Sequence, residues 1–370
     1  MTRPRIAIAH DYLTQRGGAE RVVLSLVRAF PEAVVHTTLY DPDHTYPEFR
    51  DVEIRTSTLN RSAFLRHHHR AAFPVLAPAS SQLHIDADVT VISSSGWAHG
   101  FDYSGQGLVY CHAPARWLYQ SRNYVGGPLY RSPMGWGLAL ARPALRRWDR
   151  HAALRADRYV CNSTVVRSRI MAAYSIDAEV VPAPFAIDTT EPRQPVDQLA
   201  DWDDGYLLIV SRLLPYKNVD AAIEAVRGTE RRLVVVGTGP LAATLKAAAP
   251  SNVRFTSGLT DAQLAWVYSH AQMLIAPSLE DYGLTPLEAG AFGKPTVALG
   301  AGGYLDTITE GVNGLFFDAP QPSAIAAGVA RAEQMSWSPD ALAQHMHNFS
   351  EEVFVERMRR EAEQLLTRDR

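Results

Sequence analysis

The chain has 370 residues, a length typical of two domains, and its 46% hydrophobic and 20% charged residues are ordinary for a globular protein. The net charge of −3 argues against general nucleic-acid binding, and no apolar run approaches the roughly 18 residues of a membrane span. Cys111 and Cys161 lie in apolar runs, which predicts buried thiols in a reducing compartment. A strand pattern begins at Arg5 with no signal-peptide pattern, so we expect a cytoplasmic protein, or one attached only peripherally to the inner face of the plasma membrane.

Strand and helix patterns alternate through the first half of the chain. Residues 5–10 (RIAIAH) predict a strand, Gly17 and Gly18 end the following loop, and residues 19–30 have helical spacing. A strand, a glycine loop and a helix start present backbone N–H groups to an anion, although most Gly-Gly pairs are only turns. Further strands are predicted at 34–39, 89–94, 107–113 and 158–163.

Metal-like and basic patterns also occur in this half. The histidines at 67–69 suggest a metal site, but consecutive helical residues point about 100° apart and rarely share one metal. The D-x-D sequences at 41–43 and 86–88 are interpreted as turns or helix caps, so we expect no metal site. Basic and apolar residues mix at 61–78 and 142–158. For the stretch at 61–78, two interpretations fit about equally well: a basic amphipathic segment that faces a membrane surface or an acidic acceptor, and a plain solvated helix.

A proline-rich segment separates the two halves. Residues 181–198 contain four prolines and little periodicity, which is typical of a semi-rigid linker. We therefore expect an N-terminal domain at 1–185, a linker at 186–200, a second domain at 201–350 and a C-terminal helix at 351–370. Within the second domain, strands are predicted at 206–211, 233–237, 253–258, 273–276, 295–300 and 311–317.

Two loops of the second half carry candidate binding residues. Arg212 and Lys217 flank the loop after its first strand, and such a pair suits a diphosphate, although two solvated cations would look the same. After the strand at 273–276 comes a loop with Gly283, and Thr285 is expected to be the N-cap of a helix. The amides and dipole of that helix start suit a phosphate. Glu280 and Glu288 flank the loop, and Glu288 is alternatively only part of a capping box with Thr285.

Residues 280–288 (EDYGLTPLE) resemble the E-x7-E nucleotide-sugar motif of the family-4 retaining glycosyltransferases, which have the GT-B fold. The surrounding Pro-Leu-Glu-Ala and Gly-Lys-Pro strings make the match more specific. Residues 211–218 (SRLLPYKN) resemble the family's strand–Arg–Pro–x–Lys–Asn element, and 110–114 (YCHAP) its His-Thr-Pro segment, with Ala113 replacing Thr. The resemblance covers nearly all of the chain. It implies an α/β protein of two Rossmann-like, doubly wound domains facing across a cleft, with a C-terminal helix crossing back to the first.

The resemblance also implies roles for individual residues. Glu280 would contact the sugar hydroxyls, Glu288 the ribose, and His112 the transferred sugar, while Arg212 and Lys217 would neutralise the diphosphate. The remaining residues implied to contact the donor are Gly17 and Gly18, which face its phosphates, Gly258 and Leu259, which receive the base, and the helix start at Gly283, Leu284 and Thr285.

The expected activity is metal-independent, cofactor-independent, retaining transfer of a hexose from a nucleotide diphosphate-sugar to a saccharide or lipid-linked acceptor. The strings at 10–22, 110–119 and 211–218 look most like the GDP-mannose-dependent mannosyltransferases of polysaccharide and lipid-linked oligosaccharide assembly. Alternatives are a UDP-sugar donor, an epimerase or phosphorylase of the same fold, and a non-catalytic protein that binds sugar nucleotides or scaffolds an assembly complex. A Rossmann oxidoreductase is disfavoured because residues 15–20 (QRGGAE) lack G-x-G-x-x-G.

Overall fold

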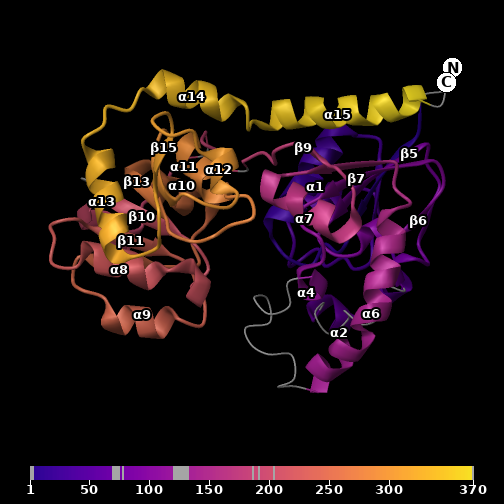
Figure 1. Cartoon of the computed structure of the whole chain (residues 1–370), viewed down its shortest axis with the longest axis horizontal. Coiled ribbons are helices and arrows are strands. Elements are labelled where there is room, and N and C mark those ends of the chain that lie inside the picture. The colour runs from indigo at the N-terminus through magenta and orange to yellow at the C-terminus, as the bar shows by residue number, and fades with distance from the viewer. Residues whose placement is uncertain are drawn as a thin grey trace. The chain divides into compact units, whose positions relative to one another are not determined.

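The computed structural model describes residues 4–68, 76, 79–119, 133–185, 187–190, 192–202 and 205–368, without the side chains of 133–139 and 368. The chain divides into two compact units. Unit 1 comprises Met1–Pro184 and Glu351–Arg370, and unit 2 comprises Phe185–Ser350. Each unit has a parallel sheet with helices around it (Figure 1).

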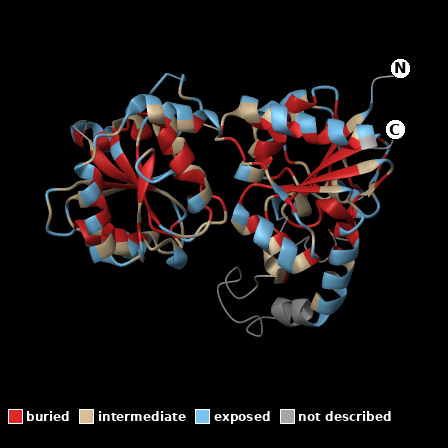
Figure 2. Ribbon diagram, turned by 45° about the horizontal axis from the view of Figure 1, so that its top comes forward, coloured by how far each residue is buried: buried red, intermediate tan, exposed pale blue. Residues whose placement is uncertain are grey.

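The sheet of unit 1 is parallel at every pairing between neighbouring strands. Its apolar strands are buried because helices cover the sheet, which is typical of parallel sheets (Figure 2). In spatial order the strands are β3 (Ile54–Thr56), β2 (Val34–Thr37), β1 (Ile6–His10), β5 (Val89–Ser94), β7 (Gln106–Cys111), β8 (Arg158–Cys161) and β9 (Glu179–Val180). A separate two-stranded sheet pairs β4 (His84–Ile85) with β6 (Asp102–Tyr103).

The C-terminal helix packs on unit 1, as expected. Helix α15 (Glu351–Arg368) lies beside α1 (Gly18–Ala29), where Ser25 Oγ donates a 2.6 Å hydrogen bond to Glu351 (Figure 1). Arg158 of β8 also donates to Glu361 over 2.7 Å. The described part of this unit also contains the α-helices α2 (Ala63–His67), α4 (Arg116–Tyr119), α6 (Pro133–Ala153) and α7 (Thr164–Tyr174).

The sheet of unit 2 is also parallel throughout. Its spatial order is β12 (Val253–Thr256), β11 (Leu233–Val236), β10 (Tyr206–Val210), β13 (Ala271–Ala276), β14 (Thr296–Leu299) and β15 (Gly314–Phe317). The helices are α8 (Val219–Val226), α9 (Ala242–Ala248), α10 (Asp261–His270), α11 (Leu284–Ala291), α12 (Tyr304–Thr307), α13 (Pro322–Glu333) and α14 (Pro339–His347).

Alternate residues of the central strand β10 face two different hydrophobic cores. Leu207 and Ile209 pack in a cluster with α8 and α13, whereas Tyr206 and Leu208 pack in a cluster with α10 and α11. This period of two is what a strand requires when helices cover both faces of its sheet. Among the described residues, no helix is both long enough and apolar enough to cross a bilayer.

Candidate active site

The strand order of unit 2 places a topological switch point between β10 and β13. From β10 the chain proceeds to β11 and β12 on one side, then returns to β13 and continues to β14 and β15 on the other. In open parallel sheets ligands bind outside the carboxyl ends of the strands at such a point. The loop with Arg212 and Lys217 follows β10, and the loop with Glu280 follows β13, so both reach this position.

Lys217 and Glu280 form an ion pair across the switch point. Lys217 Nζ donates to Oε1 of Glu280, which also accepts a 2.6 Å hydrogen bond from Ser278 Oγ. The side chains are only 11% and 25% exposed, so the charges interact in a partly desolvated setting. Asn218 Nδ2 donates to the Pro277 carbonyl over 2.9 Å, which joins the two loops. The structure therefore brings together one cation and one carboxylate that the sequence placed far apart.

Arg212 lies on the exposed side of the same loop. Its guanidinium donates a 3.3 Å hydrogen bond to the hydroxyl of Tyr216, and Lys217 Nζ lies 5.2 Å from the centre of the Tyr216 ring. Tyr216 therefore contacts both cations. The loop thus presents two positive charges near one aromatic side chain, an arrangement suited to binding a diphosphate.

The helix after Glu280 begins differently from the sequence prediction. The N-cap of α11 is Gly283, with φ of 91°, so the prediction of Thr285 as the cap and of a capping box with Glu288 is wrong. A Cβ on Gly283 would lie 2.6 Å from Cδ1 of Tyr304, so this position requires glycine for space as well as for its dihedral angle. Because glycine has no side chain to cap the helix, the first amides of α11, at Leu284 and Thr285, suit an anion.

Glu288 is held by α10 instead. The buried hydroxyl of Tyr268 donates a 2.6 Å hydrogen bond to Glu288 Oε2. Burial, together with the neighbouring Glu288, raises the pKa of Tyr268 well above its usual value. The phenol therefore stays protonated and acts as the hydrogen-bond donor. The ring of Tyr268 stacks on Phe292, with centroids 5.7 Å apart, which fixes the position of the donor.

Gly258 and Leu259 follow the edge strand β12, at the same end of the sheet as the Lys217 loop. Gly258 has φ of 69°, and nothing lies within 4 Å of the place that its Cβ would occupy. Leu259 packs against the core that contains Tyr268. This turn therefore leaves open space at a strand end.

In unit 1 the corresponding switch point lies between β1 and β5. His112 contacts a residue at this point through its side chain. His112 directly follows β7, and its Nε2 lies 2.8 Å from Ser93 Oγ at the end of β5. Ser93 Oγ also lies 3.0 Å from Nδ1 of His10 at the end of β1. Burial, with smaller contributions from His10 and Arg116, lowers the pKa of His112 to about 3, so the imidazole is neutral at physiological pH.

Gly17 and Gly18 lie at the start of α1, with Gly17 as the N-cap. A Cβ on Gly17 would lie 2.5 Å from Oε2 of Glu20, so a larger residue there would displace that buried carboxyl. Burial raises the pKa of Glu20 above its usual value. Thr45 and Tyr46 support the loop through hydrogen bonds to the carbonyls of Gln15 (3.0 Å) and Gly17 (3.4 Å).

The sequence analysis missed several polar groups of these sites. Asp11, directly after β1, accepts backbone N–H groups of Trp97 and Ala98 over 2.9 and 2.7 Å and so fixes the chain that follows β5. His10, Ser93 and Tyr268 were also missed. His10, Asp11 and Ser93 lie at strand ends, which was the available signal, whereas Tyr268 lies within a helix and offered none.

Comparison with known protein families accounts for this arrangement. A model described as Glycosyltransferase Family 4 matches residues 16–191, and one described as Glycosyl transferases group 1 matches residues 191–352. The two matches adjoin at residue 191, close to the start of unit 2 at Phe185. The chain belongs to the family-4 glycosyltransferases.

Curated relatives are similar at modest identity. The GDP-mannose-dependent alpha-(1-6)-phosphatidylinositol monomannoside mannosyltransferase of Mycolicibacterium smegmatis is 30% identical over 53% of this chain and 57% of its own length. The match thus spans little more than half of that relative. The alpha-1,3/1,6-mannosyltransferase ALG2 of Rhizomucor pusillus is 22% identical over 92% of this chain and 88% of its own length.

Solved structures agree on the fold. The Anabaena protein Alr3699/HepE, in complex with UDP, superposes with a TM-score of 0.68 at 16% identity, covering 98% of this chain and 100% of that one. This family-4 glycosyltransferase therefore has the GT-B fold, with two Rossmann-like units and the C-terminal helix on unit 1, as the sequence predicted.

Proposed function

We propose that this family-4 glycosyltransferase is a retaining enzyme that transfers mannose from GDP-mannose to a saccharide or lipid-linked acceptor. The observation that carries the proposal is the Lys217–Glu280 pair at the switch point of unit 2, beside the glycine-capped start of α11. The choice of mannose rests on the relatives, since those from M. smegmatis and R. pusillus are both named as mannosyltransferases.

The donor's diphosphate would bind Lys217, Arg212 and the first amides of α11. These groups place positive charge where the departing diphosphate gains negative charge, and such preorganised charge lowers the barrier. Glu280 would accept hydrogen bonds from the sugar hydroxyls. Lys217 Nζ has three protons, so it can keep its contact with Glu280 while it donates to a phosphate oxygen.

The other donor contacts come from neighbouring loops. Glu288, held by Tyr268, would accept from the ribose hydroxyls, and Gly258 and Leu259 would border the base. In unit 1, Nε2 of His112 is engaged by Ser93, so Nδ1 is the atom that remains for the transferred sugar. Gly17 and Gly18 would contribute amides to the phosphates.

The chemical step we propose requires no protein nucleophile and no metal at the donor site. The bond between the anomeric carbon and the phosphate oxygen breaks, and the acceptor oxygen bonds to the same face of that carbon. The acceptor's proton passes to the phosphate oxygen that leaves. The products are the glycosylated acceptor and the nucleoside diphosphate.

A UDP-sugar is the second candidate donor. The observation that favours it is the likeness to Alr3699/HepE, which has been solved with UDP and with UDP-glucose. Both donors present the same diphosphate to Lys217 and Arg212, so the choice between them depends on the base and on one or two sugar hydroxyls.

Contact with an anionic membrane is the part of the proposal that concerns the acceptor. Helices α2 and α6 carry the apolar side chains Phe64 and Leu140, which are 62% and 81% exposed, and Arg147 on α6 is also exposed. Of the stretch at 61–78, residues 69–75, 77 and 78 lie outside the described residues. Co-sedimentation with phosphatidylglycerol vesicles should fall for Leu140→Ser and persist for Met171→Ser, which changes another exposed apolar residue. Equal binding by both variants, or no binding by the native chain, would refute the proposed membrane contact.

A donor panel tests the central proposal. The full chain is incubated separately with GDP-mannose, UDP-glucose and other nucleotide sugars, and release of the nucleoside diphosphate is followed. We expect turnover with GDP-mannose, its loss in Glu280→Ala, and its retention in Glu230→Gln, which alters an exposed glutamate of the same unit. No turnover with any donor, with or without saccharide acceptors, would refute the enzyme assignment and favour a non-catalytic binding protein.

A further inference from the structure

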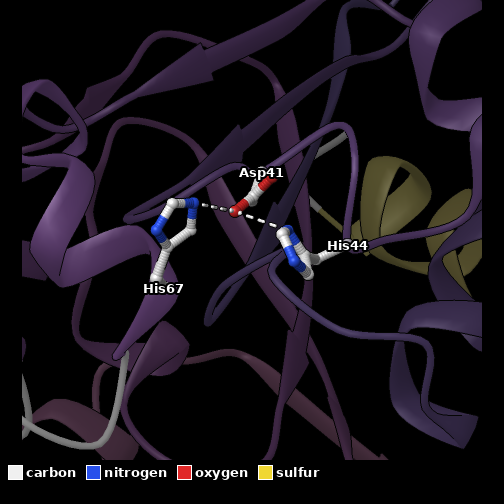
Figure 3. Close-up of side chains that lie close together, drawn as sticks. All are labelled: Asp41, His44 and His67. Carbon is white, nitrogen blue, oxygen red and sulfur yellow. Dashed lines mark ion pairs between the residues drawn. The ribbon is translucent and has the colours of Figure 1, made fainter.

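Three side chains from two segments of unit 1 converge outside the donor site (Figure 3). Asp41 and His44 lie in the loop after β2, and His67 is the last residue of α2. One ligand atom from each, a carboxylate oxygen or an imidazole nitrogen, lies within 4.8 Å of the other two. We call these residues the Asp41 cluster.

The carboxylate of Asp41 lies between the two imidazoles in Figure 3. Its Oδ2 is 3.0 Å from Nδ1 of His44 and 3.4 Å from Nε2 of His67, so one carboxylate oxygen contacts both imidazoles. The other oxygen, Oδ1, accepts from the Asp43 N–H over 3.2 Å, and the Asp41 N–H donates to the Leu13 carbonyl over 2.9 Å. Asp41 is therefore fixed and buried, with its second oxygen turned toward two imidazoles.

The two histidines are accessible from solvent. Their side chains are 63% and 53% exposed, against 6% for Asp41, and their ring centroids are 5.4 Å apart. An ion could therefore enter without opening the fold, and the imidazoles have room to turn. Ligand atoms around a tetrahedral zinc ion are about 3.4 Å apart, given metal–ligand bonds of about 2.0–2.2 Å. The two oxygen–nitrogen distances of the cluster are already close to that value.

The geometry points to a binding site for one divalent transition-metal ion, held by Asp41, His44 and His67, for which Zn²⁺ is the best match. Two imidazoles and one carboxylate suit Zn²⁺ and its neighbours in the first transition series, whereas Mg²⁺ and Ca²⁺ prefer oxygen ligands. Three protein ligands leave at least one position for water on the exposed side. This departs from the sequence-based expectation that the chain has no metal site.

Nearby histidines differ from the cluster in ways that make them controls. His68 stacks on Phe64, with ring centroids 4.7 Å apart, so it points away from the direction of His67, as consecutive helical residues should. His84 forms a hydrogen-bonded pair with Asp102 over 2.7 Å. That pair joins one imidazole to one carboxylate, whereas Asp41 Oδ2 faces two imidazoles.

The bound ion would connect α2 to the chain that supports the Gly17 loop. Directly after His44, Thr45 Oγ1 donates to the Gln15 carbonyl over 3.0 Å, and Arg16 Nε donates to the Thr45 carbonyl over 3.2 Å. A metal at the Asp41 cluster would thus restrain the loop through the hydrogen bonds of Thr45. Its role is structural, and the site stands whether or not the proposed transfer reaction is correct.

Metal titration of the full chain without a polyhistidine tag tests the inference. After removal of metals with chelator, Zn²⁺ is titrated by calorimetry, and Co²⁺ is followed by its visible absorption. We expect one Zn²⁺ per chain and a higher midpoint of thermal unfolding with the ion. Even loss of an outer-shell partner typically costs 10–100-fold in affinity, so His44→Gln and His67→Gln should each weaken binding at least about 10-fold. His68→Gln and His84→Gln should leave it unchanged.

Three results would overturn the site: no stoichiometric binding of Zn²⁺ by the native chain, equal weakening by the control variants, or binding that persists in His44→Gln and His67→Gln. Because both histidines are exposed, these variants should fold, and circular dichroism of the metal-free proteins checks this. Mg²⁺ at the same concentration should neither displace Co²⁺ nor raise the unfolding midpoint. Displacement of Co²⁺ by Mg²⁺ would contradict the imidazole ligands.

Discussion

Removing the hydroxyl of Tyr268 tests how Glu288 is held. In Tyr268→Phe the aromatic ring remains stacked on Phe292, but Glu288 Oε2 loses the donor that lies 2.6 Å away. The carboxylate of Glu288 then has more freedom to turn. If Glu288 binds the ribose of the donor, the variant should bind donor more weakly while its fold stays intact.

The size of the effect follows from the kind of hydrogen bond lost. A hydrogen bond to a charged group is worth about 1.5–3 kcal/mol, which corresponds to roughly 10- to 100-fold in an equilibrium constant. Glu288 makes further interactions that the substitution leaves in place. We therefore expect the lower end of this range, a weakening of about 10-fold in the Kd for the donor.

Tyr206→Phe is the matched control. Tyr206 is as deeply buried as Tyr268, and its hydroxyl donates over 2.8 Å to the backbone carbonyl of Val267 rather than to a carboxylate. Calorimetric titration with GDP-mannose should show weaker binding for Tyr268→Phe alone, while both variants lose about 1 kcal/mol or more of unfolding free energy in urea. Equal donor affinity in the two variants would refute the role given to the Tyr268–Glu288 pair.

Three further substitutions probe other parts of the account. Gly283→Ala should abolish donor binding, because the added methyl group would collide with Tyr304. Gly228→Ala is the control: its φ is 71° but the space around it is open, so it should lower only the stability of the fold. Equal donor affinity in the two variants would contradict this prediction. His36 has a pKa lowered to about 4 by burial and by Arg55, so its neutral form stabilises the fold and about 3 kcal/mol should be lost as the pH falls from 6.5 to 4. Urea unfolding of His36→Leu should show a flatter acid slope than the native chain, and an unchanged slope would exclude this cause. Ser93→Ala should lower kcat with little change in donor KM, and an unchanged kcat would show that its contact with His112 is dispensable.

The parallel strands were predictable because each is a short apolar run bounded by turn residues. The segment at 89–94 was predicted as a strand and is β5, buried along its whole length. Likewise the helical spacing at 19–30 corresponds to α1 (Gly18–Ala29). These elements follow from local hydrophobic patterning, so tertiary contacts did not alter them.

The start of α11 was predicted wrongly because two signals competed. The order Thr-Pro-Leu-Glu is typical of a capped helix start, but Gly283 adopts a positive φ that begins the helix earlier. The true partner of Glu288 is Tyr268, on the preceding helix, and no local pattern records a contact across that distance. The capping-box alternative therefore failed for a tertiary reason.

The Asp41 cluster also depends on a tertiary contact that local sequence patterns do not record. The D-x-D sequence at 41–43 does form a turn, since the Asp43 N–H donates to Asp41. The histidines at 67 and 68 do diverge, as helical geometry requires. Each interpretation was sound for its own segment, but the approach of His67 to Asp41 depends on how the loop after β2 packs against α2.

Binding of GDP and GMP to the native chain and to Lys217→Ala tests the central claim, that the loop after β10 and the start of α11 bind a nucleotide diphosphate. GDP should bind more tightly than GMP to the native chain. Lys217→Ala should weaken GDP by at least about 10-fold, because a charge-assisted hydrogen bond is lost, and should change GMP little. Lys246→Ala, on the exposed side of α9, should affect neither. Equal affinity for GDP and GMP, or equal weakening of both in Lys217→Ala, would contradict the account.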